Sequence, residues 1–127
     1  MKRHIIILVL WTLILLGVLL APIGEAEIPA PWGFKHWDKV YHFGLFAITG
    51  FVGVFSVRFL NLFRSRMLFG IVFGLFLAVS TEFAQSLIPC RNMSLYDLLA
   101  DVIGLGVSLS LYTFLHRQAG LRAFFKL

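Results

Sequence analysis

Four apolar stretches, separated by short polar connections, account for most of this chain of 127 residues. A helix needs about 20 mostly apolar residues to cross the hydrocarbon core of a lipid bilayer. The stretches cover about residues 5–21, 38–58, 67–88 and 95–115. Short connections favour neighbouring helices that run in opposite directions. The sequence therefore predicts an all-α, polytopic membrane protein, with one domain of four antiparallel transmembrane helices.

The composition agrees with a protein that resides in lipid. Hydrophobic residues make up 60% of the chain and charged residues only 13%, a departure from soluble domains in the direction that burial in a bilayer requires. The formal net charge is +5, but the basic residues lie between the apolar stretches, where they anchor and orient a membrane protein. We therefore expect no nucleic-acid partner.

The first apolar stretch has a second interpretation, as a cleaved signal peptide. Gly24-Glu25-Ala26 resembles the small-residue cleavage site that ends such peptides. The apolar run over residues 5–21 is long for a signal peptide, which favours a retained helix. The sequence leaves open whether the first stretch is kept or removed.

The charges in the connections predict the orientation of the helices. Cytoplasmic connections of membrane proteins carry an excess of Lys and Arg. One side here has eight basic residues and the other has three: Lys2, Arg3, Arg58, Arg64, Arg66, Arg117, Arg122 and Lys126 against Lys35, Lys39 and Arg91. Both termini are therefore predicted to be cytoplasmic. All six acidic residues fall in the opposite, outer half of the protein.

Three different stretches place an ionisable residue at nearly the same depth. With a helical rise of about 1.5 Å per residue, His42 lies roughly 6 Å below the outer end of its helix, and Glu82 and Asp101 lie roughly 9 Å below theirs. A charge costs about 2.5 to 3.5 kcal/mol at the membrane centre, so such residues usually face the bundle interior and find partners there. We expect these three side chains to face one another.

Further polar residues share helical faces with these three. Spacings of three or four residues place two side chains on one face of a helix. Lys39 and Arg91, at the outer ends of their helices, are expected to supply the compensating positive charge. The pairs on shared faces are Asp38 with His42, Glu82 with Gln85, and Asp97 with Asp101.

Two local features shape the fourth stretch. Ser94 precedes its first apolar residue and is predicted to cap the helix, with Asp97 three residues later as its capping-box partner. Gly104 and Ser108 continue the face of Asp101 as small residues. Small residues let a neighbouring helix approach closely, so this face is expected to be a helix contact.

Three segments of the polar set occur in a defined order: Asp38-Lys39-Val40-Tyr41-His42, then Glu82-Phe83-Ala84-Gln85, then Arg91-Asn92-Met93-Ser94-Leu95-Tyr96-Asp97. On these helices and in this order they resemble the three motifs of the VanZ-like family of membrane proteins, over residues 38 to about 108. The family is named after a protein associated with resistance to the antibiotic teicoplanin. The resemblance implies a bacterial inner or plasma membrane and a role in the cell envelope, without implying a reaction.

One position departs from the family pattern. The family often has asparagine where this chain has Asp101. The carboxyl adds a potential negative charge beside Asp97. The local hydrogen bonding is therefore expected to differ from the usual one in the family.

Three functional interpretations follow from the polar set. The first is a site that binds an anionic lipid, an envelope precursor or a lipophilic antibiotic at the outer leaflet. The second is an enzyme that acts on a lipid-linked envelope substrate by acid–base chemistry, for which the candidates are His42, Glu82 and Asp97. In this interpretation Asp38 or Glu82 is expected to orient His42. The third is a polar network that only fixes helix packing. The candidate ligand-binding residues are Asp38, Lys39, His42, Glu82, Gln85, Arg91, Ser94, Asp97 and Asp101.

Metal binding and transport have less support. His42, Glu82, Asp97 and Asp101 offer nitrogen and oxygen ligands, but each belongs to a separate segment and none has the local spacing of a zinc site. We therefore expect no metal and no cofactor. The inner halves of the four stretches are nearly free of ionisable groups, so no polar path for transport is predicted. The expected partners are membrane lipids or lipid-linked precursors, and the oligomeric state is not predicted.

Overall fold

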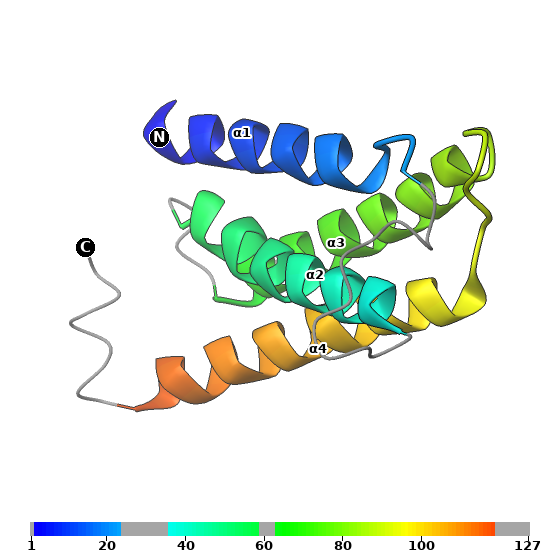
Figure 1. Ribbon diagram of the computed structural model, residues 1–127. Coiled ribbons are helices and arrows are strands. Elements are labelled where there is room, and N and C mark those ends of the chain that lie inside the picture. Colours follow the sequence, from blue (N-terminus) through cyan, green and yellow to red (C-terminus); the bar gives the residue numbers. More distant parts are fainter. Residues whose placement is uncertain (1, 24–35, 59–62, 119–127) are drawn as a thin grey trace.

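The computed structural model describes residues 2–23, 36–58 and 63–118, which form four helices (Figure 1). The helices are α1 (Lys2–Leu19), α2 (Trp37–Ser56), α3 (Phe63–Gln85) and α4 (Leu95–Arg117). The prediction of four helices is therefore confirmed, and the ends differ from their predicted positions by at most four residues. Several predictions lie outside the described residues, namely those on Gly24, Glu25, Ala26, Lys35, Arg122 and Lys126.

α3 ends at Gln85, three residues before its predicted end. The helix was expected to continue to Ile88, immediately before Pro89. Instead, the backbone N–H of Ile88 donates to the carbonyl of Gln85 at 3.0 Å, a bond that tightens the chain into a turn. A residue before proline disfavours the helical conformation. Cys90 then has a φ of 69°, in the left-handed region, and the chain turns toward α4.

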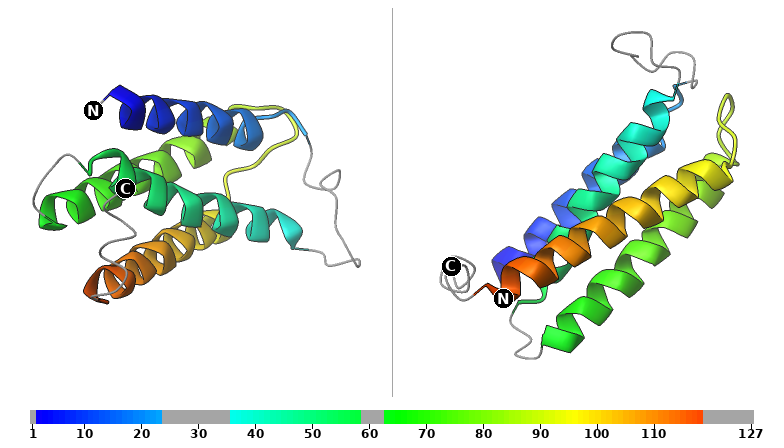
Figure 2. Two further views of the ribbon diagram at one scale, coloured as in Figure 1. Left: turned by 90° about the vertical axis from the view of Figure 1, so that its left-hand side faces the viewer. Right: turned by 90° about the horizontal axis from the view of Figure 1, so that it is seen from below.

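Consecutive helices run in opposite directions, as predicted (Figure 1). α2 contacts each of the other three helices, and α3 also contacts α4. In Figures 1 and 2, α2 lies between α1 and α4. Because α2 is covered by three neighbours, its side chains form the centre of the bundle.

Small residues allow α2, α3 and α4 to approach one another closely. A Cβ atom on Gly104 would collide with the backbone carbonyl of Phe43, and one on Gly50 would collide with the Oγ atom of Ser108. A Cβ atom on Gly53 would lie 3.3 Å from the Cα atom of Gly70. The predicted close contact at Gly104 and Ser108 is therefore present, between α4 and α2.

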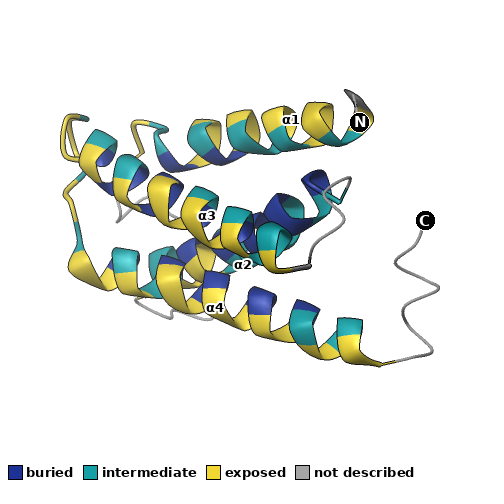
Figure 3. Ribbon diagram, turned by 180° about the vertical axis from the view of Figure 1, so that it is seen from behind, coloured by how far each residue is buried: buried dark blue, intermediate teal, exposed yellow. Residues whose placement is uncertain are grey.

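Each helix has an exposed face (Figure 3), and many of the exposed side chains are large and hydrophobic. Exposed side chains include Leu13, Phe76 and Phe114, whereas the buried set contains several ionisable residues. An apolar exterior around a polar interior suits a lipid environment better than water. The segments Trp37–Ser56, Arg64–Gln85 and Leu95–Arg117 are long and apolar enough to cross a membrane, and Arg3–Leu19 is a shorter apolar helix. The described chain thus has the character of a membrane protein.

Because of the close contact at Gly104, we expect alanine substitutions at two glycines of α4 to differ strongly in their effect on stability. In Gly104→Ala the added methyl group meets the Phe43 carbonyl, and overpacking of this kind costs about 1–3 kcal/mol of stability. Gly106→Ala is the matched control, because nothing lies within 4 Å of its Cβ position. Thermal unfolding in detergent, followed by circular dichroism, should give a lower Tm for Gly104→Ala only. Equal Tm values would show that this contact does not limit the packing.

Candidate functional site

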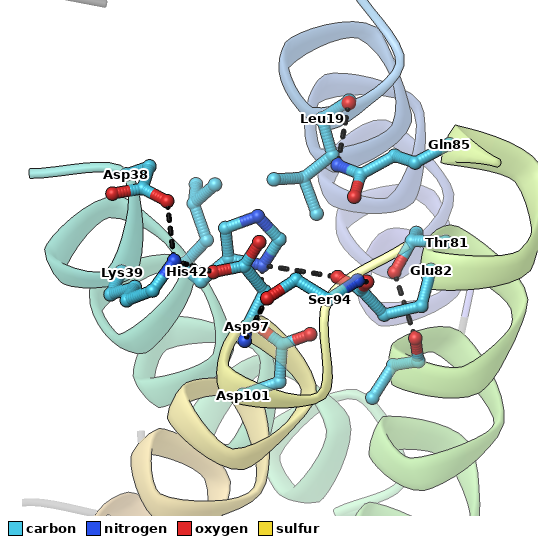
Figure 4. A network of polar contacts seen from close by, with 12 residues as sticks. Leu19, Asp38, Lys39, His42, Thr81, Glu82, Gln85, Ser94, Asp97 and Asp101 are labelled. Carbon is cyan, nitrogen blue, oxygen red and sulfur yellow. Dashed lines mark hydrogen bonds and ion pairs between the residues drawn. The ribbon is translucent and has the colours of Figure 1, made fainter. Parts of the chain in front are cut away.

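Four buried ionisable residues lie at one end of the bundle, where α2 begins, α3 ends and α4 begins (Figure 4). We call this the site end. His42, Glu82, Asp97 and Asp101 are each at most 3% exposed there. Ionisable groups inside a membrane bundle are costly and usually face partners, which explains why they turn away from the apolar exterior.

His42, Glu82 and Asp101 form a buried triad with one residue from each of α2, α3 and α4. The Nδ1 atom of His42 lies 2.9 Å from Oδ1 of Asp101, within hydrogen-bond distance, and 3.8 Å from Oε1 of Glu82. With Asp101 ionised, Nδ1 is the donor, because a carboxylate only accepts. The three residues expected at one depth are therefore in contact.

Two carboxylate oxygens of the triad have no hydrogen-bond partner among the described residues. They are Oε1 of Glu82 and Oδ2 of Asp101, and both are buried. A buried polar atom without a partner costs about 1–3 kcal/mol, and more when it is charged. These two oxygens are therefore available to accept a further hydrogen bond or to pair with a further positive charge.

Lys39 forms two ion pairs beside the triad. Its Nζ atom lies 2.6 Å from Oδ2 of Asp38 and 2.7 Å from Oδ1 of Asp97. The prediction that Lys39 supplies compensating positive charge is thus confirmed. The second pair joins the first turn of α2 to the first turn of α4. Because the Lys39 side chain remains 28% exposed, it marks the rim of the site end.

The capping of α4 differs from the prediction. The Ser94 side chain accepts from the backbone N–H of Asp97 at 3.3 Å, as expected of a cap. The reciprocal bond from Asp97 is not formed, because that carboxylate pairs with Lys39. Glu82 of α3 takes its place and accepts from the Ser94 N–H at 2.9 Å. The expected local capping box is therefore wrong, and α3 completes the cap of α4.

Gln85 and Arg91 bind the end of α1. Gln85 Nε2 donates to the Leu19 carbonyl at 2.9 Å. Arg91 donates to the same carbonyl at 3.0 Å and to the carbonyl of Ile23 at 3.1 Å. The last carbonyls of a helix lack partners within it and carry partial negative charge. These two side chains thus hold α1 on the bundle, a role that sequence reasoning missed because a backbone acceptor has no sequence signature.

Asp38 does not orient His42, although the two lie on one helical face. The described partner of Asp38 is Lys39, and the described partner of His42 is Asp101. Their partners differ because Asp38 lies at the rim, one turn above the triad, where Lys39 reaches it. Ligand binding by the predicted residues, including Gln85, Arg91 and Ser94, stays a prediction.

Sequence comparison relates this chain to a yeast protein. The chain is 32% identical over 111 residues to an uncharacterized protein of the fission yeast Schizosaccharomyces pombe. The match covers 87% of this chain and 65% of the relative, so this chain spans about two thirds of the relative's length. No family model matches the sequence. No solved structure matches it either.

The Lys39 ion pairs predict a stability effect that a second substitution should reverse. Lys39→Met leaves the Asp97 carboxylate, whose side chain is 5% exposed, without its counter-charge. Breaking a fully buried pair costs about 3–5 kcal/mol, and we expect less here because Lys39 is partly exposed. The double variant Lys39→Met/Asp97→Asn should recover part of the lost Tm in detergent. No recovery would mean that the pair does not couple α2 to α4.

Proposed function

We propose that this chain binds the anionic head group of a lipid, of a lipid-linked envelope precursor or of a lipophilic antibiotic at the site end. The proposal rests on one observation: ionisable side chains of three helices converge at a single end, with Lys39 and Arg91 beside them. The ligand's apolar part would remain in the lipid along the helices. Its head group would meet the charged rim.

Arg91 is the principal anchor in this proposal. Its guanidinium donates only to the carbonyls of Leu19 and Ile23 in the described part of the chain, and no carboxylate is paired with it there. Its positive charge is therefore not neutralised by a described acidic group. Guanidinium groups bind phosphate and carboxylate through paired, charge-assisted hydrogen bonds. Lys39 contributes less, because two carboxylates already share it.

A network that served packing alone would be built differently. Interhelical hydrogen bonds in membranes contribute only about 0.6 kcal/mol on average. The close contacts at Gly50 and Gly104 already bring α2 and α4 together. Two buried oxygens without a described partner weaken such a network rather than strengthen it. These features favour a binding role over a purely structural one.

The orientation of His42 favours a second candidate, an enzyme acting on a lipid-linked substrate. Asp101 holds Nδ1, so Nε2 of the neutral ring is an acceptor that points away from both carboxylates of the triad (Figure 4). A histidine held in this way is suited to act as a general base toward water or a hydroxyl group. Ser94 is occupied as a helix cap, so water is the favoured nucleophile. A turnover assay with envelope lipids that stays at background would contradict this candidate.

We further propose that the chain is a VanZ-like protein of a bacterial inner or plasma membrane, with both termini cytoplasmic. The three segments that resemble the family motifs supply His42 and Glu82 of the triad, the Lys39 ion pairs and the cap of α4. The excess of basic residues at the opposite end supports the orientation. The envelope setting and any response to glycopeptide antibiotics rest on the resemblance. A resistance role requires its own test, namely growth in teicoplanin with and without the gene.

The binding proposal predicts the loss of a bound lipid. Native mass spectrometry of the detergent-purified protein should show an anionic lipid that co-purifies with it. Arg91→Ala should remove most of this species and Lys39→Ala should reduce it. Arg117→Ala is the matched control, since Arg117 is exposed at the other end of α4. An unchanged lipid profile in Arg91→Ala would contradict the proposal.

The orientation can be tested through the chain's single cysteine. Cys90 is exposed and lies between α3 and α4 at the site end. A membrane-impermeant maleimide should label it in intact cells. In Cys90→Ser/Arg117→Cys the new thiol lies at the other end of α4 and should react only after the cells are lysed. The reverse pattern would place the site end in the cytoplasm.

A further inference from the structure

We infer that the buried triad of His42, Glu82 and Asp101 is a binding site for a divalent transition-metal ion of the Zn²⁺ type. Each residue offers one ligand atom, and these three atoms lie within 4.8 Å of one another. All three residues are buried. They come from three different helices, so the packing of the bundle itself creates the cluster.

The distances fit a shared ion after small side-chain adjustments. Zinc bonds to nitrogen and oxygen ligands are about 2.0–2.2 Å long, which places neighbouring ligand atoms roughly 3.0–3.5 Å apart. The distances from His42 Nδ1 are 2.9 Å to Asp101 and 3.8 Å to Glu82. These values lie on either side of the required range. All three ligand atoms lie within 4.8 Å of one another, so the two carboxylate side chains would move closer together on binding the ion.

The charge balance is the second, independent observation. Glu82 and Asp101 are both 0% exposed, and each keeps a buried oxygen with no partner among the described residues. Lys39 does not neutralise these two carboxylates, because it is bound between Asp38 and Asp97. A divalent ion would neutralise two carboxylates and give Oε1 of Glu82 a partner. Because Nδ1 of His42 carries the proton shared with Asp101, metal binding at Nδ1 would move that proton to Nε2. Proteins seldom bury two carboxylates together without such compensation.

The set of ligand atoms indicates the kind of ion. One imidazole nitrogen and two carboxylate oxygens suit Zn²⁺ and its neighbours such as Mn²⁺, whereas Ca²⁺ and Mg²⁺ prefer oxygen ligands and water. Three protein ligands are also the number found in zinc sites that keep an open position for water or substrate. The Ser94 N–H bond to Oε2 of Glu82 would act as an outer contact that orients this ligand.

Asp101 supplies the third ligand as a carboxylate. An asparagine at this position would offer a neutral amide, which is a weaker metal ligand. The Asp101 carboxylate also adds a buried negative charge, which needs a positive partner. A bound cation would also lie beneath the rim where the proposed anionic head group binds, but the metal site itself does not depend on that proposal.

Metal binding by the full-length protein tests the inference. The protein is purified in detergent, stripped with a chelator and titrated with Zn²⁺ or Mn²⁺ alone by isothermal titration calorimetry. We expect one equivalent per chain. Glu82→Gln and Asp101→Asn should each weaken binding at least about tenfold. Arg117→Ala is the control, since Arg117 is exposed at the other end of α4, and it should bind as the wild type does.

A measurement on the wild type keeps the test decisive if a variant fails to fold. Zn²⁺ should raise the Tm of the stripped wild-type protein, because an ion that binds only the folded state stabilises it. No binding and no rise in Tm for either ion would overturn the inference. Equal affinity in well-folded Glu82→Gln and Asp101→Asn would also overturn it, by showing surface binding. Loss of lipid binding with intact metal binding would contradict only the proposed function.

Discussion

Ionisable side chains inside an apolar bundle need partners, and this need organises the site end. Glu82 reaches the first turn of α4 through the Ser94 N–H, and Asp101 reaches back to His42 on α2. Each bond joins two different helices, so the polar contacts and the helix packing depend on each other. An isolated helix would have to expose these groups to lipid, at a cost of several kcal/mol.

The remaining polar residues of the site end each make a different contact between helices. Lys39 joins the beginnings of α2 and α4, while Gln85 and Arg91 receive the end of α1. Along the rest of the bundle, glycines permit close approach of backbones, and Trp11 of α1 donates a hydrogen bond to Thr49 of α2 at 2.9 Å. Charged contacts therefore gather at one end, while small residues and apolar packing hold the rest. At the site end, the triad is the part whose bonding is incomplete within the described chain.

An incomplete buried site is the feature that most strongly suggests a ligand. The carboxylate oxygens without partners belong to Glu82 and Asp101, which are also the most deeply buried of the acidic residues that the structure describes. A cation in the triad and an anionic head group at the rim are compatible, since the first would add positive charge below the second. The yeast relative shares about a third of its aligned residues with this chain, and its name describes no activity. The proposed function therefore rests on the geometry of the site end.

The four helices and their order were determined by the sequence, because the length and apolar character of a span are local properties. The depth of His42, Glu82 and Asp101 could also be predicted from the sequence, because a helix has a constant rise per residue. Only the tertiary structure decided the partners. Asp101 rather than Asp38 holds His42, Glu82 rather than Asp97 completes the cap of Ser94, and the carbonyl of Leu19 occupies Gln85. Helical spacing states which side chains share a face, but the rotation and separation of neighbouring helices determine which of them meet.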